Sequence, residues 1–330
     1  MALASTLQIG GADRVMANLA KYIDRDRFRV LVCHLKERGV VGDEIERGGT
    51  EIVGVPSASR GIQRYLSYRR LARVVREHDI ELIHSHTTYS LVDGALCTLL
   101  AERNVRLVHT FHFGNYPHYP LHYRLMEGVA SRASDQLVAV GQEQANVIAN
   151  MYRLKRDRLN VIVNGVDSMA ARPDPEWRAR LSRRDAVVIG TICTFIEQKG
   201  LPYLLRVAAQ LKAAGMRAVF VVVGDGHLRP QIQRDCEAMG LSDYVYLTGW
   251  KNEAGITMMP LFHIFFQPSL WEALYMVVLE AMAAGKPVVA TDVGDNRHVV
   301  RHDQTGYVVP VSDVDAMAKA LQRLVHSEER

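Results

Sequence analysis

The chain of 330 residues has no run of about 18 consecutive apolar residues, so the sequence predicts no membrane-spanning helix. Cysteine is scarce, and Cys33, Cys97, Cys193 and Cys236 lie far apart without a Cys-x-x-Cys pair. That spacing excludes the usual structural zinc sites and predicts four buried thiols in a reducing cytoplasm. The first residues carry neither a basic segment nor a long apolar one, so we expect no secretory signal.

Extremes of composition are also missing. Charged residues make up 23% of the chain and hydrophobic ones 48%, which argues against both a disordered chain and a coiled coil. The length suits two domains of about 150 residues each. The net charge of +4 is uneven, because residues 1–167 hold 22 Lys+Arg against 18 Asp+Glu and the remainder holds 18 of each. This excess favours an anionic partner for the first half.

Short apolar, β-branched runs alternate with stretches of helical periodicity such as 201–211 and 228–239. Most runs are continuous in hydrophobicity, as in parallel strands that are buried on both faces. We therefore predict an α/β fold of two doubly wound, Rossmann-like sheets. The predicted strands are 29–34, 51–55, 80–84, 105–109, 136–140, 160–163, 186–192, 218–223, 244–247, 263–266 and 287–290.

The boundary between the two domains is predicted in the stretch 164–185, where turn and proline signals interrupt the pattern. We divide the chain into an N-terminal domain of residues 1–167 and a C-terminal domain of residues 168–330. Ligands of such sheets bind at the carboxyl ends of the strands.

The segment 268–294 places Glu272 just before a predicted helix, 275–284, and Glu280 inside it. Eight helical residues rise about 12 Å, too far for a hydrolase carboxylate pair at about 5–9.5 Å. A better interpretation is one ligand lying along the segment, with a phosphate on the first helical amides near Met276 and Val277 and a ribose on Glu280. Two solvated glutamates on a surface helix are the alternative.

This segment resembles the donor-site signature of the family 4 retaining glycosyltransferases of GT-B fold, Glu-x7-Glu followed by Glu-Ala-Met-Ala-x-Gly-Lys-Pro-Val-Val-Ala-Thr. Where the family usually has Gly-Phe-Gly after the first Glu, this chain has Ala273-Leu274-Tyr275. Gln198-Lys199-Gly200-Leu201 resembles the motif whose Lys contacts the donor diphosphate. The Arg that usually lies five residues before this Lys is replaced by Thr194.

Other segments match in the same order along the chain. Gly10-Gly11 resembles the family's N-terminal glycine pair. His84, His86 and His112 resemble the histidines that the family has at two strand ends, and residues 164–167 resemble its signature at the domain crossover. Gly224 and the pair Trp250-Lys251 match segments that line the nucleobase. The resemblance covers residues 7–325.

The resemblance implies a role for each matching residue. Lys199 and the amides of Met276 and Val277 would stabilise the diphosphate, Glu280 would bind the ribose, Glu272 the sugar hydroxyls, and His112 the sugar near the reacting carbon. Catalytic candidates are thus His112, Glu272 and Lys199. The implied donor-binding residues are Gly11, Thr194, Lys199, Gly224, Trp250, Lys251, Tyr275, Met276, Val277 and Glu280.

The implied reaction is sugar transfer from a nucleotide-diphosphate sugar with retention, in cell-surface polysaccharide or glycolipid synthesis. We find no convincing nucleophile, which favours a front-face route, and we identify no metal site and no cofactor. A UDP-sugar is the favoured donor, although side-chain identity does not separate it from GDP- or ADP-sugars. The partners expected are this nucleotide sugar and a sugar or lipid-linked acceptor, with no nucleic acid.

Two features of the first half concern the acceptor. Six arginines lie in 60–76 without an acidic residue, and Arg69, Arg73 and Arg76 share one helical face. They form either a solvated basic helix or a contact with anionic lipid, which would place a cytoplasmic protein peripherally on the inner face of the membrane. The segment 111–123, which contains His112 and Tyr116, either stacks on an acceptor or packs on its own domain.

The leading hypothesis is therefore an active glycosyltransferase. A catalytically weak nucleotide-sugar-binding or membrane-surface protein is the alternative, and the lack of Gly-x-Gly-x-x-Gly after a strand disfavours a nicotinamide-dependent oxidoreductase. Because only nine residues precede Gly10, we expect the N-terminal sheet to lack its first strand. We also expect the chain to end before the closing C-terminal helices.

Overall fold

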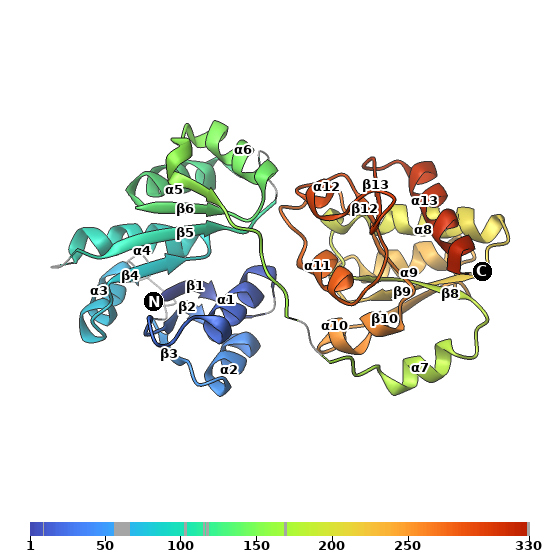
Figure 1. Cartoon of the computed structure of the whole chain (residues 1–330), viewed down its shortest axis with the longest axis horizontal. Helices are drawn as coiled ribbons and strands as arrows, with labels where there is room; N and C mark the ends of the chain where they lie inside the picture. The colour runs from blue at the N-terminus through green and yellow to red at the C-terminus, as the bar shows by residue number, and fades with distance from the viewer. Residues whose placement is uncertain are drawn as a thin grey trace. The chain divides into compact units, whose positions relative to one another are not determined.

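The computed structural model describes residues 1–8, 10–55, 67–101, 104–114, 116, 119–167 and 170–328. These residues form two compact units, Met1–Gly165 and Val166–Arg330, each with its own sheet (Figure 1). The junction lies two residues before the expected boundary at 167.

The first unit contains a seven-stranded sheet of order β3-β2-β1-β4-β5-β6-β7, with every strand pairing parallel. Its strands are β1 (Ala2–Thr6), β2 (Leu31–Glu37), β3 (Glu51–Gly54), β4 (Leu82–Ser85), β5 (Arg106–Phe111), β6 (Gln136–Ala139) and β7 (Leu159–Val161). Its helices are α1 (Gly11–Tyr22), α2 (Gly39–Arg47), α3 (Ser67–Glu77), α4 (Thr88–Leu100), α5 (Leu121–Ala133) and α6 (Gln142–Tyr152), with the 3-10 turn η2 (Arg156–Arg158).

The expectation that this sheet lacks its first strand is wrong. Strand β1 lies in the sheet centre and pairs with β2 on one side and β4 on the other. Leu3 packs into the apolar core on one face and Ala4 into the core on the opposite face, and both are fully buried. The segment Ala-Leu-Ala-Ser-Thr has weak strand propensity, so its conformation comes from burial and two partner strands.

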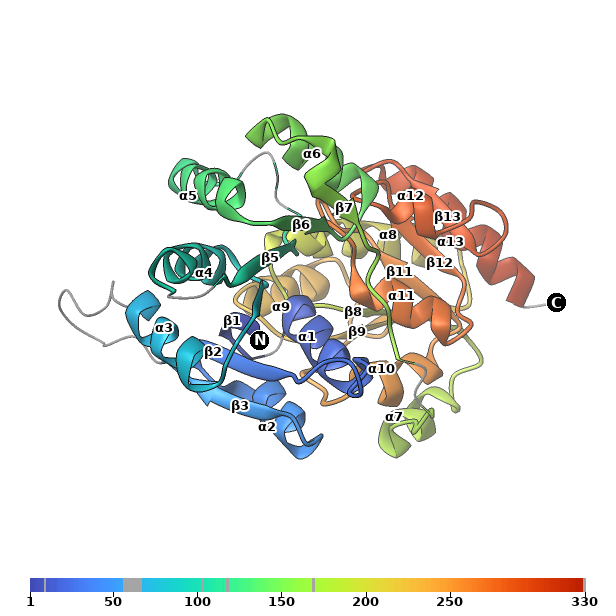
Figure 2. The same ribbon diagram turned by 60° about the vertical axis from the view of Figure 1, so that its left-hand side comes forward.

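Helices cover both faces of this first sheet (Figure 2). Buried residues of α1 and α2 form one core, whereas α3, α4 and α5 contribute to the core on the other face. The carboxyl ends of β4 and β5 therefore lead directly into segments that the sequence associates with the acceptor and the sugar.

The second unit contains a six-stranded sheet of order β10-β9-β8-β11-β12-β13. Its strands are β8 (Val187–Ile192), β9 (Ala218–Val223), β10 (Val245–Gly249), β11 (Ile264–Gln267), β12 (Val288–Thr291) and β13 (Gly306–Val309). Its helices are α7 (Pro175–Leu181), α8 (Leu201–Ala213), α9 (Arg229–Ala238), α10 (Ala254–Thr257), α11 (Met276–Ala283), α12 (Asn296–Val299) and α13 (Val314–Glu328), with the 3-10 turns η3 (Glu197–Lys199) and η4 (Met259–Leu261).

The eleven predicted strands each coincide with an observed one, with ends displaced by at most three residues. Strand β13 was missed, as was β1. The predicted helix 275–284 is confirmed as α11. Helices α8, α9 and α13 pack on one face of the second sheet, and α7, η4 and α11 on the other. The expectation about helices beyond the C-terminal end stays a prediction.

Candidate functional site

A buried ion pair joins two of the predicted catalytic residues in the second unit. The Lys199 ammonium lies 2.6 Å from Oε1 of Glu272, and their side chains are only 10% and 8% exposed. Two charges withdrawn from water in this way are held by each other and by additional hydrogen bonds. The structure therefore brings together two motifs that lie 73 residues apart in the sequence.

The backbone at Gly200 brings Lys199 to this position. Gly200 has a left-handed φ of +62°, and a Cβ atom there would lie 2.0 Å from the carbonyl oxygen of Pro268. Only glycine permits such an approach, because any side chain would overlap that carbonyl. The turn η3 therefore packs closely against the segment that leads to Glu272.

Tyr275, like Glu272, contacts the Lys199 ammonium. The ammonium lies 3.8 Å from the centroid of the Tyr275 ring, and the Tyr275 hydroxyl donates a hydrogen bond of 2.5 Å to the Ile192 carbonyl at the end of β8. Burial, and then the nearby Cys193 thiol and acidic groups, raise the pKa of Tyr275 well above its usual range. The phenol therefore stays neutral and keeps donating.

Two glutamines also donate hydrogen bonds to the Glu272 carboxylate. Gln198 donates to Oε2 at 3.0 Å, and Gln267 lies 3.5 Å from Oε1 and donates to Ser269 at 3.0 Å. Buried Asn296 in turn donates to the Gln267 side-chain oxygen at 3.0 Å. This network was not foreseen, and the one available signal was the position of Gln267 at the carboxyl end of a predicted strand.

Helix α11 carries the remaining candidates of this segment. Its N-cap residue, Tyr275, provides no side-chain cap, so the first-turn amides of Met276 and Val277 lack a partner from that side chain. Glu280 lies one turn further along, facing α10: a Cβ on Gly255 would be 3.0 Å from the Glu280 Oε2 atom. These groups follow one another along the helix, as the sequence predicts.

The segments after β9 and β10 hold the other predicted donor residues. Gly224 has a φ of +135°, and a Cβ there would lie 1.8 Å from the Cys193 carbonyl oxygen. Trp250 is half exposed, whereas the Lys251 ammonium is paired with Asp174 at 2.9 Å. Thr194, which replaces the usual arginine, is exposed.

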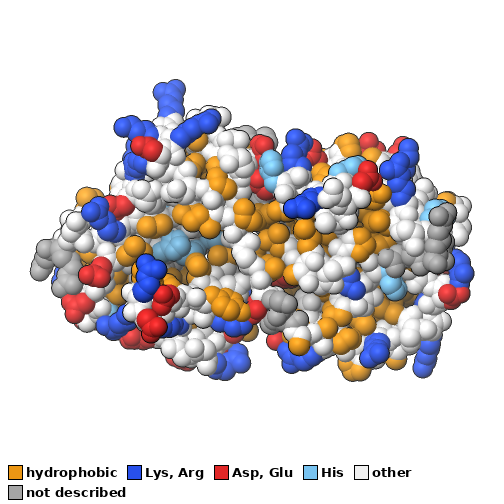
Figure 3. Space-filling view, viewed as in Figure 1, with side chains coloured by type: hydrophobic (Ala, Val, Ile, Leu, Met, Phe, Trp, Pro, Cys, Tyr) orange, Lys and Arg blue, Asp and Glu red, His pale blue; other side chains and the backbone are white. Residues whose placement is uncertain are grey.

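Two histidines meet at the strand ends of the first unit. Nδ1 of His86 lies 2.9 Å from Nε2 of His112, and their rings are stacked with centroids 5.2 Å apart. Desolvation by burial, followed by the charge of His84, lowers the pKa of His112 to about 3. His112 is therefore neutral near pH 7 and shares a single proton with His86 in this contact. On the face drawn in Figure 3, histidine side chains of this unit reach the surface among apolar ones.

Tyr116 points into its own domain. Its hydroxyl donates to Oε2 of the buried Glu127 at 2.6 Å, Tyr152 donates to the same oxygen at 2.7 Å, and Thr88 donates to Oε1 at 2.8 Å. Desolvation raises the pKa of Glu127, although these hydroxyl groups oppose that shift. The described part of 111–123 thus favours packing on its own domain over stacking on an acceptor at Tyr116.

Gly11 is the first residue of α1, next to Gly10 at the N-cap. Arg69, Arg73 and Arg76 are all exposed on α3, as their spacing predicts, whereas Arg60 and Arg64 lie outside the described residues.

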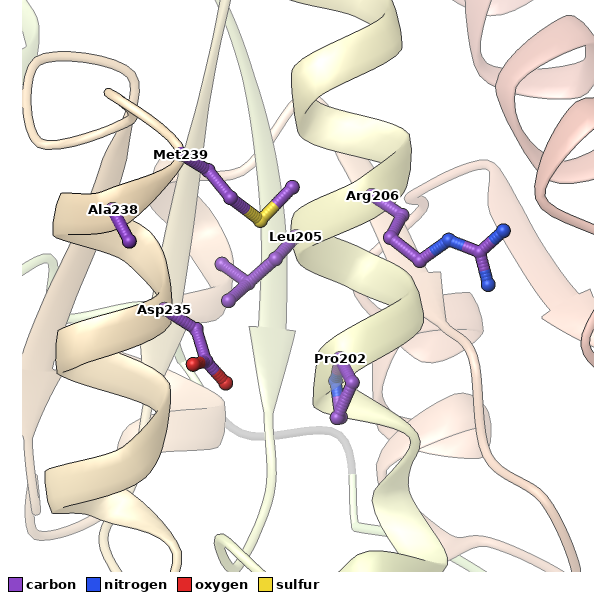
Figure 4. Close-up of a pocket in the computed structure, with 6 residues that line it drawn as sticks. All are labelled: Pro202, Leu205, Arg206, Asp235, Ala238 and Met239. Carbon is purple, nitrogen blue, oxygen red and sulfur yellow. The ribbon is translucent and has the colours of Figure 1, made fainter.

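Within the described ranges, the other possibilities are a metal site, a reactive cysteine and a further groove. Among the described residues, no three His, Cys, Asp or Glu side chains are placed to hold a metal ion. All four cysteines are buried free thiols, as predicted. A groove of about 230 Å³ between α8 and α9 is lined by Pro202, Leu205, Arg206, Asp235, Ala238 and Met239 (Figure 4). Its lining contains no predicted site residue, and the Arg206 guanidinium points away from α9.

Two family models match the chain, one in each unit. The model described as Glycosyltransferase Family 4 matches residues 9–169, and the model described as Glycosyl transferases group 1 matches residues 173–330. The chain belongs to glycosyltransferase family 4. It is a glycosyltransferase, and its two parallel-sheet units confirm the predicted GT-B fold.

Relatives of this glycosyltransferase include the UDP-Gal:alpha-D-GlcNAc-diphosphoundecaprenol alpha-1,3-galactosyltransferase of Escherichia coli. It is 24% identical over 332 residues, which span 96% of this chain and 85% of the relative. The 2-deoxystreptamine N-acetyl-D-glucosaminyltransferase of Streptomyces fradiae is 30% identical over 273 residues, 76% of this chain and 64% of that protein. The crystal structure of Anabaena HepE in complex with UDP-glucose matches with a TM-score of 0.85 at 20% identity, covering all of this chain and 91% of HepE.

Proposed function

We propose that this glycosyltransferase moves a sugar from a nucleotide-diphosphate sugar to a sugar or lipid-linked acceptor, with retention at the anomeric carbon and without a metal ion. The observation that carries the proposal is the Lys199–Glu272 pair beside the N-terminus of α11. An ammonium next to first-turn amides suits the charge that grows on a departing diphosphate.

In the front-face route, the bond between the anomeric carbon and the diphosphate oxygen breaks while the acceptor oxygen bonds to the same face of that carbon. The acceptor proton passes to the leaving phosphate, which departs as the nucleoside diphosphate. The protein then contributes positioning and charge stabilisation and needs no nucleophile of its own.

Each candidate residue takes one task in this proposal. Lys199 and the Met276 and Val277 amides bind the diphosphate, Glu280 the ribose, and Glu272 the sugar hydroxyls. Neutral His112 hydrogen-bonds the sugar near the reacting carbon, which needs no charged imidazole. The first unit would then serve the acceptor and the second the donor. The complexes of Anabaena HepE with UDP and UDP-glucose support a UDP-sugar donor.

A donor panel tests this function. We expect transfer or donor hydrolysis with at least one UDP-, GDP- or ADP-sugar, and the Glu280→Ala variant should lose at least tenfold in turnover because a ribose hydrogen bond to a carboxylate is lost. Glu237→Ala, which removes an exposed glutamate of α9, is the matched control and should keep wild-type turnover. An inactive wild type would instead support the weak nucleotide-sugar-binding alternative, which family membership does not favour.

We further propose that the first unit docks peripherally on an anionic membrane at the cytoplasmic face, near a lipid-linked acceptor. No helix in the described part of the chain is long and apolar enough to cross a bilayer. The exposed arginines of α3 lie on the same sheet face as α4 and α5, and α5 exposes Leu121, Leu125 and Val129 at four-residue intervals. Helix α4 packs against both α3 and α5, and basic and apolar side chains exposed on one layer of helices would suit contact with an anionic lipid surface.

Vesicle sedimentation checks this docking. We expect binding to phosphatidylglycerol vesicles that weakens with added salt and is weak on phosphatidylcholine. Replacing Arg69, Arg73 and Arg76 with Gln should cost about 3 kcal/mol of binding free energy, since each basic residue contributes about 1 kcal/mol. The exposed arginines of the second unit, Arg178, Arg183 and Arg234, give a control of equal charge change. Equal losses in both triple variants, or salt-independent binding, would contradict the assignment.

A further inference from the structure

Two positions of the proposed donor site differ from the family pattern, and both concern the cations that bind the diphosphate. Thr194 removes the arginine that usually shares the diphosphate with Lys199, and Tyr275 adds a ring where the pattern has glycine. We propose that Tyr275 is a positioning residue whose ring holds the Lys199 ammonium ready for the diphosphate and so offsets the missing arginine. This inference rests on the proposed function.

The ring and its anchor are both fixed. The Tyr275 hydroxyl is tied to the backbone of β8 through the Ile192 carbonyl, and the ring lies 3.8 Å from the Lys199 ammonium. The half-buried ring thus forms one wall of a cage, and the Glu272 carboxylate at 2.6 Å forms another. An ammonium has three donors, so one bond to Glu272 leaves capacity for a phosphate oxygen.

The two walls differ in what they do to the charge. A carboxylate attracts the ammonium but cancels its field toward an incoming anion. An aromatic face attracts the ammonium through its quadrupole and carries no net charge. Tyr275 can therefore restrict Lys199 while leaving its positive charge available to the donor.

Holding a cationic side chain in place before the diphosphate binds matters more when the site has one such side chain than when it has two. A guanidinium is planar and pre-organised, whereas the lysine stem is flexible and loses rotamer freedom when it binds. The family pattern supplies two cations to the diphosphate, an arginine and a lysine. In this chain the exposed Thr194 replaces the arginine, so of that pair only Lys199 is left to bind the phosphates. Holding its side chain before the donor arrives reduces the entropy lost on binding.

The test compares Tyr275→Phe with Tyr275→Leu and Tyr275→Met, each also combined with Lys199→Met. We expect the Leu and Met variants to lose about tenfold in affinity for UDP relative to uridine, and in kcat/KM, because a desolvated cation–π contact is removed. The Phe variant should stay within about threefold of wild type. In the Lys199→Met background, loss of the ring should have no further effect.

A spectroscopic signal reports on the cage without any donor. The ring should shift the Lys199 Hε resonances upfield in the free protein, and this shift should persist in Tyr275→Phe and vanish in Tyr275→Met. Circular dichroism shows whether each variant is folded, and the two non-aromatic replacements guard against failure of one of them.

Different failures have different signatures. If the Phe variant loses as much as Leu, if Leu still weakens UDP binding in the Lys199→Met background, or if uridine affinity falls as much as UDP affinity, the ring does not act through Lys199. An unshifted Hε resonance in the wild type would overturn the cage directly. A wild type that shows the shift but binds and transfers from none of the UDP-, GDP- and ADP-sugars would count against the proposed function instead.

Discussion

Lys199→Ala should lower turnover at least tenfold, and up to about a hundredfold, with the best donor of the panel. A charge-assisted hydrogen bond contributes about 1.5–3 kcal/mol, and each 1.4 kcal/mol corresponds to a factor of ten in rate. The proposal places this bond on the diphosphate, where negative charge grows as the glycosidic bond breaks. The effect should therefore appear mainly in kcat, measured in steady-state transfer assays.

The same substitution leaves Glu272 as an unpaired buried carboxylate, so stability must be measured beside activity. Breaking a buried pair costs about 3–5 kcal/mol, whereas removing both charges is far better tolerated. The double variant Lys199→Met with Glu272→Gln should accordingly regain stability, while its turnover should stay at least tenfold below wild type. Lys212→Ala, which removes a surface lysine of α8 paired with Asp243, is the matched control and should keep full activity. A Lys199→Ala variant with wild-type turnover would remove Lys199 from the mechanism.

Gly224→Ala should destabilise the second unit by more than about 3 kcal/mol and abolish donor binding as a consequence. The residue adopts a φ of +135°, and an added Cβ would lie 1.8 Å from the backbone oxygen of Cys193. A backbone atom at the end of β8 has no rotamer by which to move away, so the loop after β9 must shift. All three tryptophans, Trp177, Trp250 and Trp271, lie in the second unit, and their fluorescence in urea reports its unfolding.

Gly215→Ala separates conformational strain from collision. Gly215 also has a positive φ, +70°, but nothing lies within 4 Å of an added Cβ. Its substitution should cost about 1 kcal/mol, the usual penalty for a left-handed alanine. If both variants unfold at the same urea concentration, the contact between the added Cβ at position 224 and the Cys193 carbonyl oxygen does not lower the free energy of unfolding. The loop after β9 would then move more easily than its contacts indicate.

The strands were largely predictable because central parallel strands such as β9, β11 and β12 are buried on both faces and therefore carry continuous apolar runs. The same holds for α11, whose start and end are marked by local signals. Strand β1 escaped prediction because it is only five residues long and two of them are alanine, which has little strand propensity. Its conformation is set by β2 and β4, whose residues lie far along the chain.

The order of motifs identified the family and the fold, since these are written in short segments, and it supplied the candidate residues of the proposed donor site. Only the folded chain shows that Lys199, Glu272 and Tyr275 form one cage, that His86 contacts His112, and that Tyr116 turns inward to Glu127. These contacts join separate loops at the carboxyl ends of different strands. Side-chain direction and burial there depend on packing between elements, which local sequence does not encode.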